Sequence, residues 1–142
     1  ATIEQVVALA VLMPIVASMG GIAGSQTLTV IVRGLALGQV TDSNRAALLK
    51  KELRVGAVNG FVWAFVIGAL TFLWFNDVML SITITVAILL NLVAASLAGV
   101  VIPSILDKMK IDPALSGSVI LTTVTDIVGF VTFLGLGSLL LL

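Results

Sequence analysis

The sequence contains no cysteine and no histidine, and only 10% of its 142 residues are charged. Without cysteine the chain forms neither disulfides nor thiolate metal sites. Without histidine it lacks the commonest zinc ligand and the usual proton acceptor at neutral pH. Any metal site in this chain must therefore use oxygen ligands, and oxygen ligands favour hard cations.

An excess of charge of either sign is missing as well, because seven basic residues balance seven acidic ones. The chain therefore has no electrostatic footprint for nucleic acid. In place of charge it has apolar residues: 60% are hydrophobic, and the mean hydropathy is +1.28. Soluble domains carry about 25% charged residues. The composition and the long apolar stretches predict an all-α integral membrane protein that folds as one bundle.

Four apolar stretches are long enough to cross a bilayer, which takes about 20 helical residues. The first is longer than one straight crossing needs and contains Pro14, so we expect a tilted, kinked or broken helix there. Segment 41–54 is polar and helix-forming, and residues 41–43 offer N-caps. Residues 76–77 should form a short turn, and Pro113 is well placed to open the last helix. The predicted spans are residues 3–37, 55–75, 79–106 and 114–141.

The basic residues predict how the spans are oriented. Six of the seven Lys and Arg residues lie in the regions between the first two spans and between the last two, and Arg33 lies near the end of the first span, next to the first of these loops. By the positive-inside rule these loops are cytoplasmic, and both ends of the chain then lie outside. An outer N-terminus without a signal peptide indicates that a further span precedes this sequence; simple insertion with the N-terminus outside is the alternative. We expect a multi-pass protein of the plasma membrane or cell inner membrane.

Asp126 is the only acidic residue well inside a predicted span, and that span contains no Lys or Arg. A lone carboxylate at this depth costs at least about 2.5 kcal/mol, and such residues usually line an ion or substrate pathway. Helical spacing places Thr122 and Gly129 on the same face as Asp126, with Thr125 at its edge. Ser118 extends the same stripe toward the cytoplasm. The sequence therefore predicts a polar pathway along this face.

A second cluster lies in the stretch MPIVASMGGIAGSQ (13–26), where Pro14 and three glycines weaken the helix. Backbone carbonyls freed at membrane depth are tolerated only where they face protein or a water-filled cavity. A structural kink without further function is the alternative. Pairs of small residues four apart, such as Gly56 and Gly60, should let helix backbones approach closely.

Less specific roles remain open for these residues. Asp126 could be protonated and hydrogen-bonded to a neighbouring helix, with Asn59, Asn91 or Gln26 as its partner. Asp112 lies at the expected cytoplasmic mouth, where a loop acid or a helix cap is the alternative. The chain has no phosphate-binding loop, no serine–base pair and no paired carboxylates. We therefore do not expect an enzyme.

Two stretches resemble the membrane domain of the MgtE family of magnesium channels. MPIVASMGGIAGSQ is similar to the family's pattern of a proline followed by Gly-Asn-x-Gly-x-Gln, and DPAL…TTVTDIVG (112–129) matches a second family motif. The resemblance implies five helices per protomer, a homodimer in the lipid bilayer, and a pore between the two protomers. It also implies an N-terminal cytoplasmic sensor that closes the channel at high internal magnesium. Residues 1–142 then form a transmembrane ion-conducting domain of helices two to five, without the first helix and the sensor.

The same resemblance implies roles for individual residues. Asp126 becomes the pore carboxylate that binds magnesium through the ion's water shell, and the backbone carbonyl of Thr122 helps to line that metal site. Ile22 stands where the family usually has Asn, and SGS (116–118) stands where Ser-Gly-Pro is common. The pore-lining candidates are Gly21, Ile22, Gln26, Ser118, Thr125 and Gly129, with Asp112 at the cytoplasmic mouth.

The predicted function is that of a Mg²⁺ channel or transporter that passes divalent cations into the cell, with Mn²⁺ and Co²⁺ as further candidate ions. Two other functions fit the residues. In a proton- or sodium-coupled secondary carrier, Asp126 would gain and lose its proton in each cycle. In a scaffold without transport, the polar residues would only hold the helices together.

Overall fold

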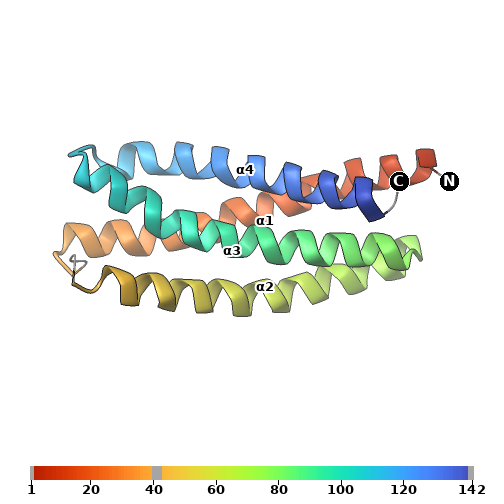
Figure 1. The fold of residues 1–142 in the computed structure, drawn as a ribbon, viewed down its shortest axis with the longest axis horizontal. Helices are drawn as coiled ribbons and strands as arrows, with labels where there is room; N and C mark the ends of the chain where they lie inside the picture. Colours follow the sequence, from red (N-terminus) through yellow and green to blue (C-terminus); the bar gives the residue numbers. More distant parts are fainter. Residues whose placement is uncertain (1, 40–42, 141–142) are drawn as a thin grey trace.

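The computed structural model describes residues 2–39 and 43–140, and their side chains except those of residues 2–6 and 114–116. In this part of the chain there are no strands and four long helices (Figure 1). They are α1 (Thr2–Ala36), α2 (Arg45–Phe75), α3 (Val78–Lys108) and α4 (Pro113–Leu140).

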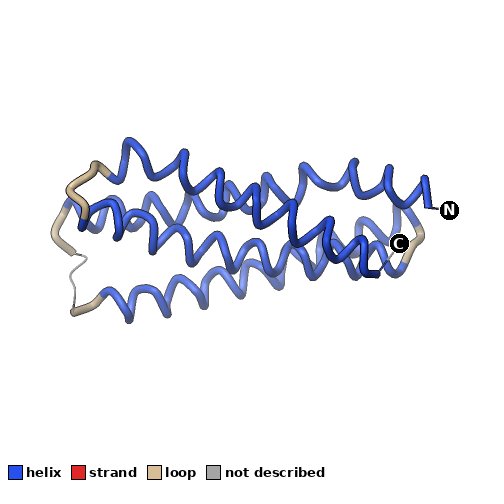
Figure 2. The backbone as a smooth tube through the Cα atoms, turned by 45° about the horizontal axis from the view of Figure 1, so that its top comes forward, coloured by secondary structure: helices blue, strands red, loops and turns tan. Residues whose placement is uncertain are grey.

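The four helices run along the long axis of the molecule as an antiparallel bundle (Figure 1). Both chain ends lie at one end of the bundle, beside the turn between α2 and α3 (Figure 2). The α1–α2 and α3–α4 connections lie at the other end. Each helix is long and apolar enough to cross a membrane. The predicted all-α membrane class and its four spans are thereby confirmed.

α3 is the central helix of the bundle. It packs against each of the other three helices, and α1 also packs against α4. Ile84 and Ile88 of α3 are fully buried and share one core cluster with Val16 of α1 and Phe133 of α4. Because lipid tails are as apolar as these side chains, close packing holds such helices together rather than escape from water.

α2 is held to α3 by a stripe of small residues. Gly56, Gly60 and Gly68 recur at every fourth or eighth position and are buried. A Cβ atom at Gly56 would collide with Ser96 Oγ, and one at Gly60 would lie 2.9 Å from the Leu89 side chain. The glycines therefore bring the two backbones close together, as the small-residue spacing predicts.

The helix ends follow local sequence signals. Asn76 ends α2 in the left-handed conformation with φ 55°. Asp77 then caps α3, because its side chain accepts a hydrogen bond from the backbone N–H of Leu80 at 3.2 Å. α4 begins at Pro113. These findings confirm the turn predicted at residues 76–77 and the opening proline of the last helix.

The first span was expected to form a tilted, kinked or broken helix. The broken helix is wrong, because α1 is continuous through Pro14. Two of its glycines serve packing. A Cβ atom at Gly20 would collide with the side chain of Asn91, and one at Gly24 would lie 3.0 Å from the side chain of Leu121. Gly20 and Gly24 thus make room for side chains of α3 and α4.

The polar segment 41–54 is not a helix of its own, because α2 runs without interruption from Arg45 into the apolar span. The N-cap of α2 is Asn44, whose side-chain Nδ2 donates to the backbone oxygen of Gln39 at 2.7 Å. Of the caps predicted at 41–43, Ser43 is not the N-cap, because the next residue takes that position. Residues 41–42 lie outside the described part.

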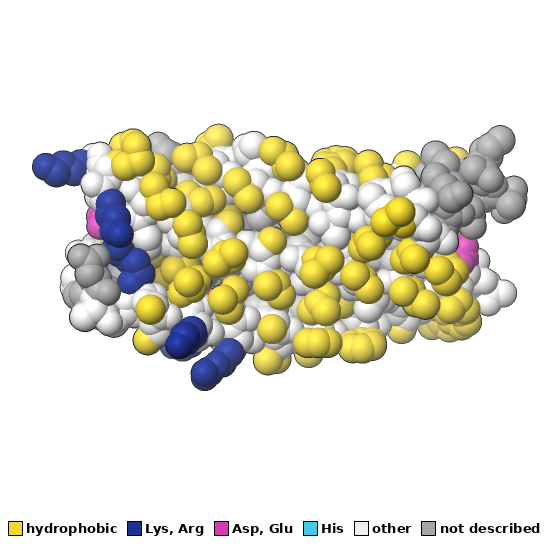
Figure 3. Space-filling model, in the orientation of Figure 1, with side chains coloured by type: hydrophobic (Ala, Val, Ile, Leu, Met, Phe, Trp, Pro, Cys, Tyr) yellow, Lys and Arg dark blue, Asp and Glu magenta, His cyan; other side chains and the backbone are white. Residues whose placement is uncertain are grey.

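The surface carries the pattern of a membrane protein. Figure 3 shows the Lys and Arg side chains, in dark blue, at the end of the bundle where the α1–α2 and α3–α4 connections lie. Hydrophobic side chains cover the length between the ends (Figure 3). Large apolar side chains such as Phe65, Leu73 and Trp74 of α2 are exposed, which suits a lipid-facing surface.

Candidate functional site

Asp126 lines an open groove between α1 and α4. The groove has a volume of about 590 Å³, and Asp126 is half-buried in its wall. Asp126 also lies near the middle of α4, far from both ends of the apolar span. The other lining residues are Ala17, Ser18, Gly21, Ile22, Ser25, Gln26 and Thr29 of α1, and Thr122 of α4.

Helical spacing explains why polar groups meet in this groove. On α4, Thr122 and Asp126 are one turn apart and share a face. On α1, Ser18, Ser25 and Thr29 are spaced at i, i+7 and i+11, which also places them on one face. The Thr29 hydroxyl donates to the backbone oxygen of Ser25 at 2.8 Å, so its own oxygen can still accept a hydrogen bond. Two otherwise apolar helices thus turn their polar faces toward the same groove.

The carboxylate of Asp126 has no protein partner in the described part of the chain. It makes no hydrogen bond and no ion pair there, and none of the lining residues is basic. The nearby Thr125 hydroxyl donates instead to the backbone oxygen of Thr122 at 3.1 Å. An uncompensated carboxylate is costly at membrane depth. A groove of carboxylate, hydroxyl and amide oxygens offers the ligand chemistry that a hydrated hard cation requires.

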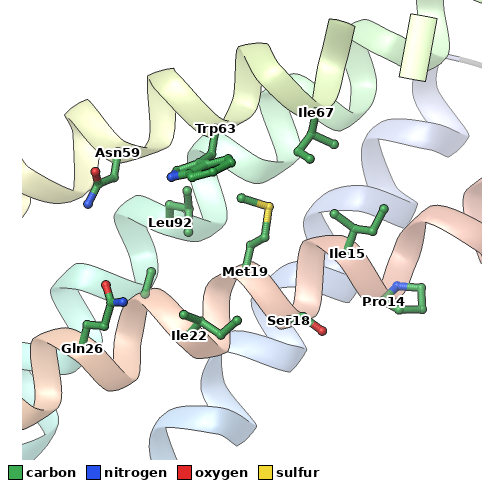
Figure 4. Close-up of a pocket in the computed structure, with 11 residues that line it drawn as sticks. Pro14, Ile15, Ser18, Met19, Ile22, Gln26, Asn59, Trp63, Ile67 and Leu92 are labelled. Atoms are coloured by element: carbon green, nitrogen blue, oxygen red, sulfur yellow. The ribbon is translucent and has the colours of Figure 1, made fainter. Parts of the chain in front are cut away.

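The three amides that could have held Asp126 by hydrogen bonds do not do so among the described residues. Asn91 is fully buried, and its Nδ2 donates to the backbone oxygen of Val16 at 3.0 Å. Asn59 faces a different groove, between α1 and α2 (Figure 4). Gln26 lines both grooves without a hydrogen bond to Asp126.

The groove brings together the two predicted metal-site residues and three of the predicted pore-lining residues. Asp126 and Thr122 come from α4, and Gly21, Ile22 and Gln26 come from α1. This juxtaposition joins the two motifs that were singled out in the sequence at opposite ends of the chain.

Four other predicted residues do not line the groove. Thr125 is fully buried, and Gly129 lies on the same buried stripe of α4, where a Cβ atom would lie 3.1 Å from Asn91 Nδ2. Thr125 and Gly129 share one face of α4 because they are four residues apart. This face lies next to the face that carries Thr122 and Asp126, and it points toward the core. Ser118 and Asp112 are exposed closer to the basic end of the bundle.

Three groove residues were missed by the sequence reasoning. Ser18, Ser25 and Thr29 carry hydroxyl groups into the groove. Their spacing along one face of an apolar helix is the signal that could have identified them.

A bundle of four apolar helices with polar side chains gathered in one open groove defines a multi-span α-helical membrane protein. The chain belongs to the MgtE family, whose family model is described as a divalent cation transporter and matches residues 13–136.

Relatives in three bacteria support this assignment, and each is named magnesium transporter MgtE. The Bacillus subtilis relative is 32% identical over 136 residues, which cover 96% of this chain and 30% of that protein. The Enterococcus faecalis relative is 33% identical over 131 residues, 92% of this chain and 29% of that protein. The Thermus thermophilus relative is 30% identical over 139 residues, 98% of this chain and 31% of that protein.

The chain therefore spans less than a third of the length of these relatives. The relatives are named as transporters and not as enzymes, and the chain is an integral membrane protein of a divalent cation transporter family.

Proposed function

We propose that this chain forms the ion-conducting domain of a Mg²⁺ transport protein, in which two copies place their α1–α4 grooves face to face. The observation that carries the proposal is the carboxylate of Asp126, which has no protein partner among the described residues and lines an open groove near the middle of a membrane span. When two copies enclose a pore, the transported cation balances the charge of Asp126, because the described residues provide no basic group in the groove.

Two-fold symmetry gives the charge that the ion needs. Each copy contributes one Asp126, so that two carboxylates face one divalent cation across the axis. Mg²⁺ gives up its water reluctantly and prefers octahedral oxygen ligation. The hydroxyl and amide groups of the groove, together with the backbone oxygen of Thr122, can hydrogen-bond to the water shell of the ion. The pore thus holds a hydrated ion and does not need to strip it.

The proposed direction of transport follows from the charge pattern at the ends of the bundle. We place the basic end of the bundle (Figure 3) in the cytoplasm, and both ends of the chain outside. The membrane potential then favours inward flow by about 2.3 kcal/mol per charge and per 100 mV.

Mg²⁺ is the proposed ion because the relatives are named for it, and competition with Mn²⁺ and Co²⁺ measures how selective the groove is. The proposed setting is the plasma membrane, with the chain as one domain of a longer protein that also contains a further membrane helix and a cytoplasmic sensor.

Chemical cross-linking tests the pairing of the two grooves, and the natural absence of cysteine makes the experiment clean. Thr122 and Thr123 are adjacent exposed residues of α4, but only Thr122 lines the groove. We expect a short bifunctional methanethiosulfonate reagent to link two copies of a Thr122→Cys protein in membranes, with protection by Mg²⁺. The matched Thr123→Cys protein should stay monomeric on a denaturing gel. Equal cross-linking of both variants, or of neither, contradicts the proposed interface.

Ile22 gives a prediction about affinity for Mg²⁺, because it places an apolar side chain in the groove with 62% of its surface exposed. Replacing Ile22 by Asn adds an amide that can hydrogen-bond to the water shell of the ion. One hydrogen bond contributes about 0.5–1.5 kcal/mol, so we expect the KM for Mg²⁺ uptake to fall about 3–10-fold. Ile22→Leu keeps the side chain apolar and serves as the control. The same KM in both variants would show that Ile22 does not face the ion.

A further inference from the structure

We propose a second cation-binding site, apart from the Asp126 groove, in a polar pocket between α1, α2 and α3. The pocket has a volume of about 260 Å³. Glu52 of α2 is its one charged lining residue among those described, and it lies in the third of α2 that is closer to the basic end. The neutral polar residues of the wall are Gln26, Thr27, Asn59 and Ser96.

Glu52 is a buried residue whose carboxylate has no protein partner among the described residues. Only 8% of its surface is exposed. It forms no hydrogen bond and no ion pair with any residue that the structure describes. Removing a carboxylate from water costs several kcal/mol unless it is paired, and the pocket wall offers no Lys or Arg. A bound cation supplies the missing charge.

The ligands around Glu52 have the chemistry of a hard-cation site. Each of them has an oxygen atom that can coordinate a metal ion: the carboxylate, the amides of Gln26 and Asn59, and the hydroxyls of Thr27 and Ser96. Mg²⁺ is commonly bound through one or two carboxylates while it keeps several waters. A water molecule takes about 30 Å³ of liquid volume, so the pocket has room for an ion together with part of its water shell. The absence of cysteine and histidine disfavours softer metals.

The place of the pocket gives the second site a structural role. Farther along the bundle, α1 and α2 are separated by an open, mainly apolar groove of about 700 Å³ (Figure 4). Gln26 of α1 and Asn59 of α2 line both this groove and the Glu52 pocket. A cation in the pocket therefore joins α2 to α1. Gln26 also lines the Asp126 groove, so the bound ion restrains the part of α1 that forms one wall of the proposed pore.

The test counts bound Mn²⁺, as a probe for Mg²⁺, by electron paramagnetic resonance on the purified chain in mild detergent. We expect one ion per chain at the Glu52 pocket, in addition to one ion per two chains at Asp126. Glu52→Gln should weaken the per-chain class more than tenfold and leave the other class in place. Asp126→Asn should do the reverse, so this inference and the proposed function can fail separately. Asp107→Asn removes an exposed carboxylate at the end of α3 and should change neither class.

Thermal unfolding gives a second readout of the same site. Added Mg²⁺ should raise the Tm of the wild-type and Asp126→Asn proteins, and should raise the Tm of Glu52→Gln clearly less. If Glu52→Gln does not fold, Asn59→Ala decides, because Asn59 is exposed and neutral; it should weaken the per-chain Mn²⁺ affinity. Wild-type Mn²⁺ binding by a folded Glu52→Gln protein, or by Asn59→Ala where that variant decides, overturns the site and leaves Glu52 as a packing residue.

Discussion

An Asp126→Asn protein should fold as a dimer and transport Mg²⁺ at least about 100-fold more slowly than the wild type. The substitution keeps the volume and the hydrogen-bonding capacity of the side chain and removes only its charge. At about 5 Å, one carboxylate attracts a divalent ion by about 1.7 kcal/mol even at the dielectric constant of water. Two carboxylates on the axis therefore provide about 3 kcal/mol, and about 1.4 kcal/mol corresponds to a factor of ten.

Mg²⁺ uptake into proteoliposomes measures this effect, with thermal unfolding followed in parallel. The Tm of Asp126→Asn without Mg²⁺ should not fall, because Asp126 has no hydrogen-bond partner to lose among the described residues. Asp126→Glu keeps the charge and should retain more transport than Asp126→Asn. Asp107→Asn, at the exposed end of α3, should transport like the wild type. Normal uptake by a folded Asp126→Asn protein would refute the ion site and favour a structural role for Asp126.

Gly20→Ala should lower the thermal stability strongly, because its new Cβ atom would collide with the amide of Asn91. Asn91 has little freedom to move away. It is fully buried, it donates to the backbone oxygen of Val16 at 3.0 Å, and a Cβ atom at Gly129 of α4 would lie only 3.1 Å from its Nδ2. Overpacking of this kind costs about 1–3 kcal/mol. Since α1 and α4 also form the groove walls, we expect slower Mg²⁺ uptake as well.

A double-mutant cycle isolates this contact. In an Asn91→Ala background the space beside residue 20 is vacant, so Gly20→Ala should then cause little further loss of stability. The expected coupling between the two positions is about 1–3 kcal/mol, in the range found for residues in direct contact. Gly21→Ala is the matched control, because a Cβ atom there meets no atom within 4 Å. An equal loss from Gly20→Ala in both backgrounds would mean that Asn91 is not the cause.

Local signals in the sequence were sufficient for the elements of this fold. Apolar length gave the four spans, since a helix must satisfy its own backbone in lipid wherever it later packs. The predicted turn at residues 76–77 and Pro113 marked the starts of α3 and α4, because a tight turn and a proline act locally along the chain. The isolation of Asp126 was also visible, because the nearest basic residues in the chain lie outside its span.

Only the tertiary structure decided which polar residues meet. Periodicity placed Thr125 and Gly129 near the face of Asp126, but packing against the core turned their stripe inward and left Thr122 and Asp126 at the groove. A helical repeat defines stripes without saying which of them another helix covers.

Glu52 shows the same limit in a different way. In the sequence it belongs to a polar segment rich in basic residues and gives no sign of burial. In the fold, Gly56 brings α2 so close to Ser96 of α3 that Glu52, one turn earlier, is enclosed with residues of α1. Burial depends on how closely neighbouring helices approach, and that distance is set by side chains on both partners, far apart along the chain.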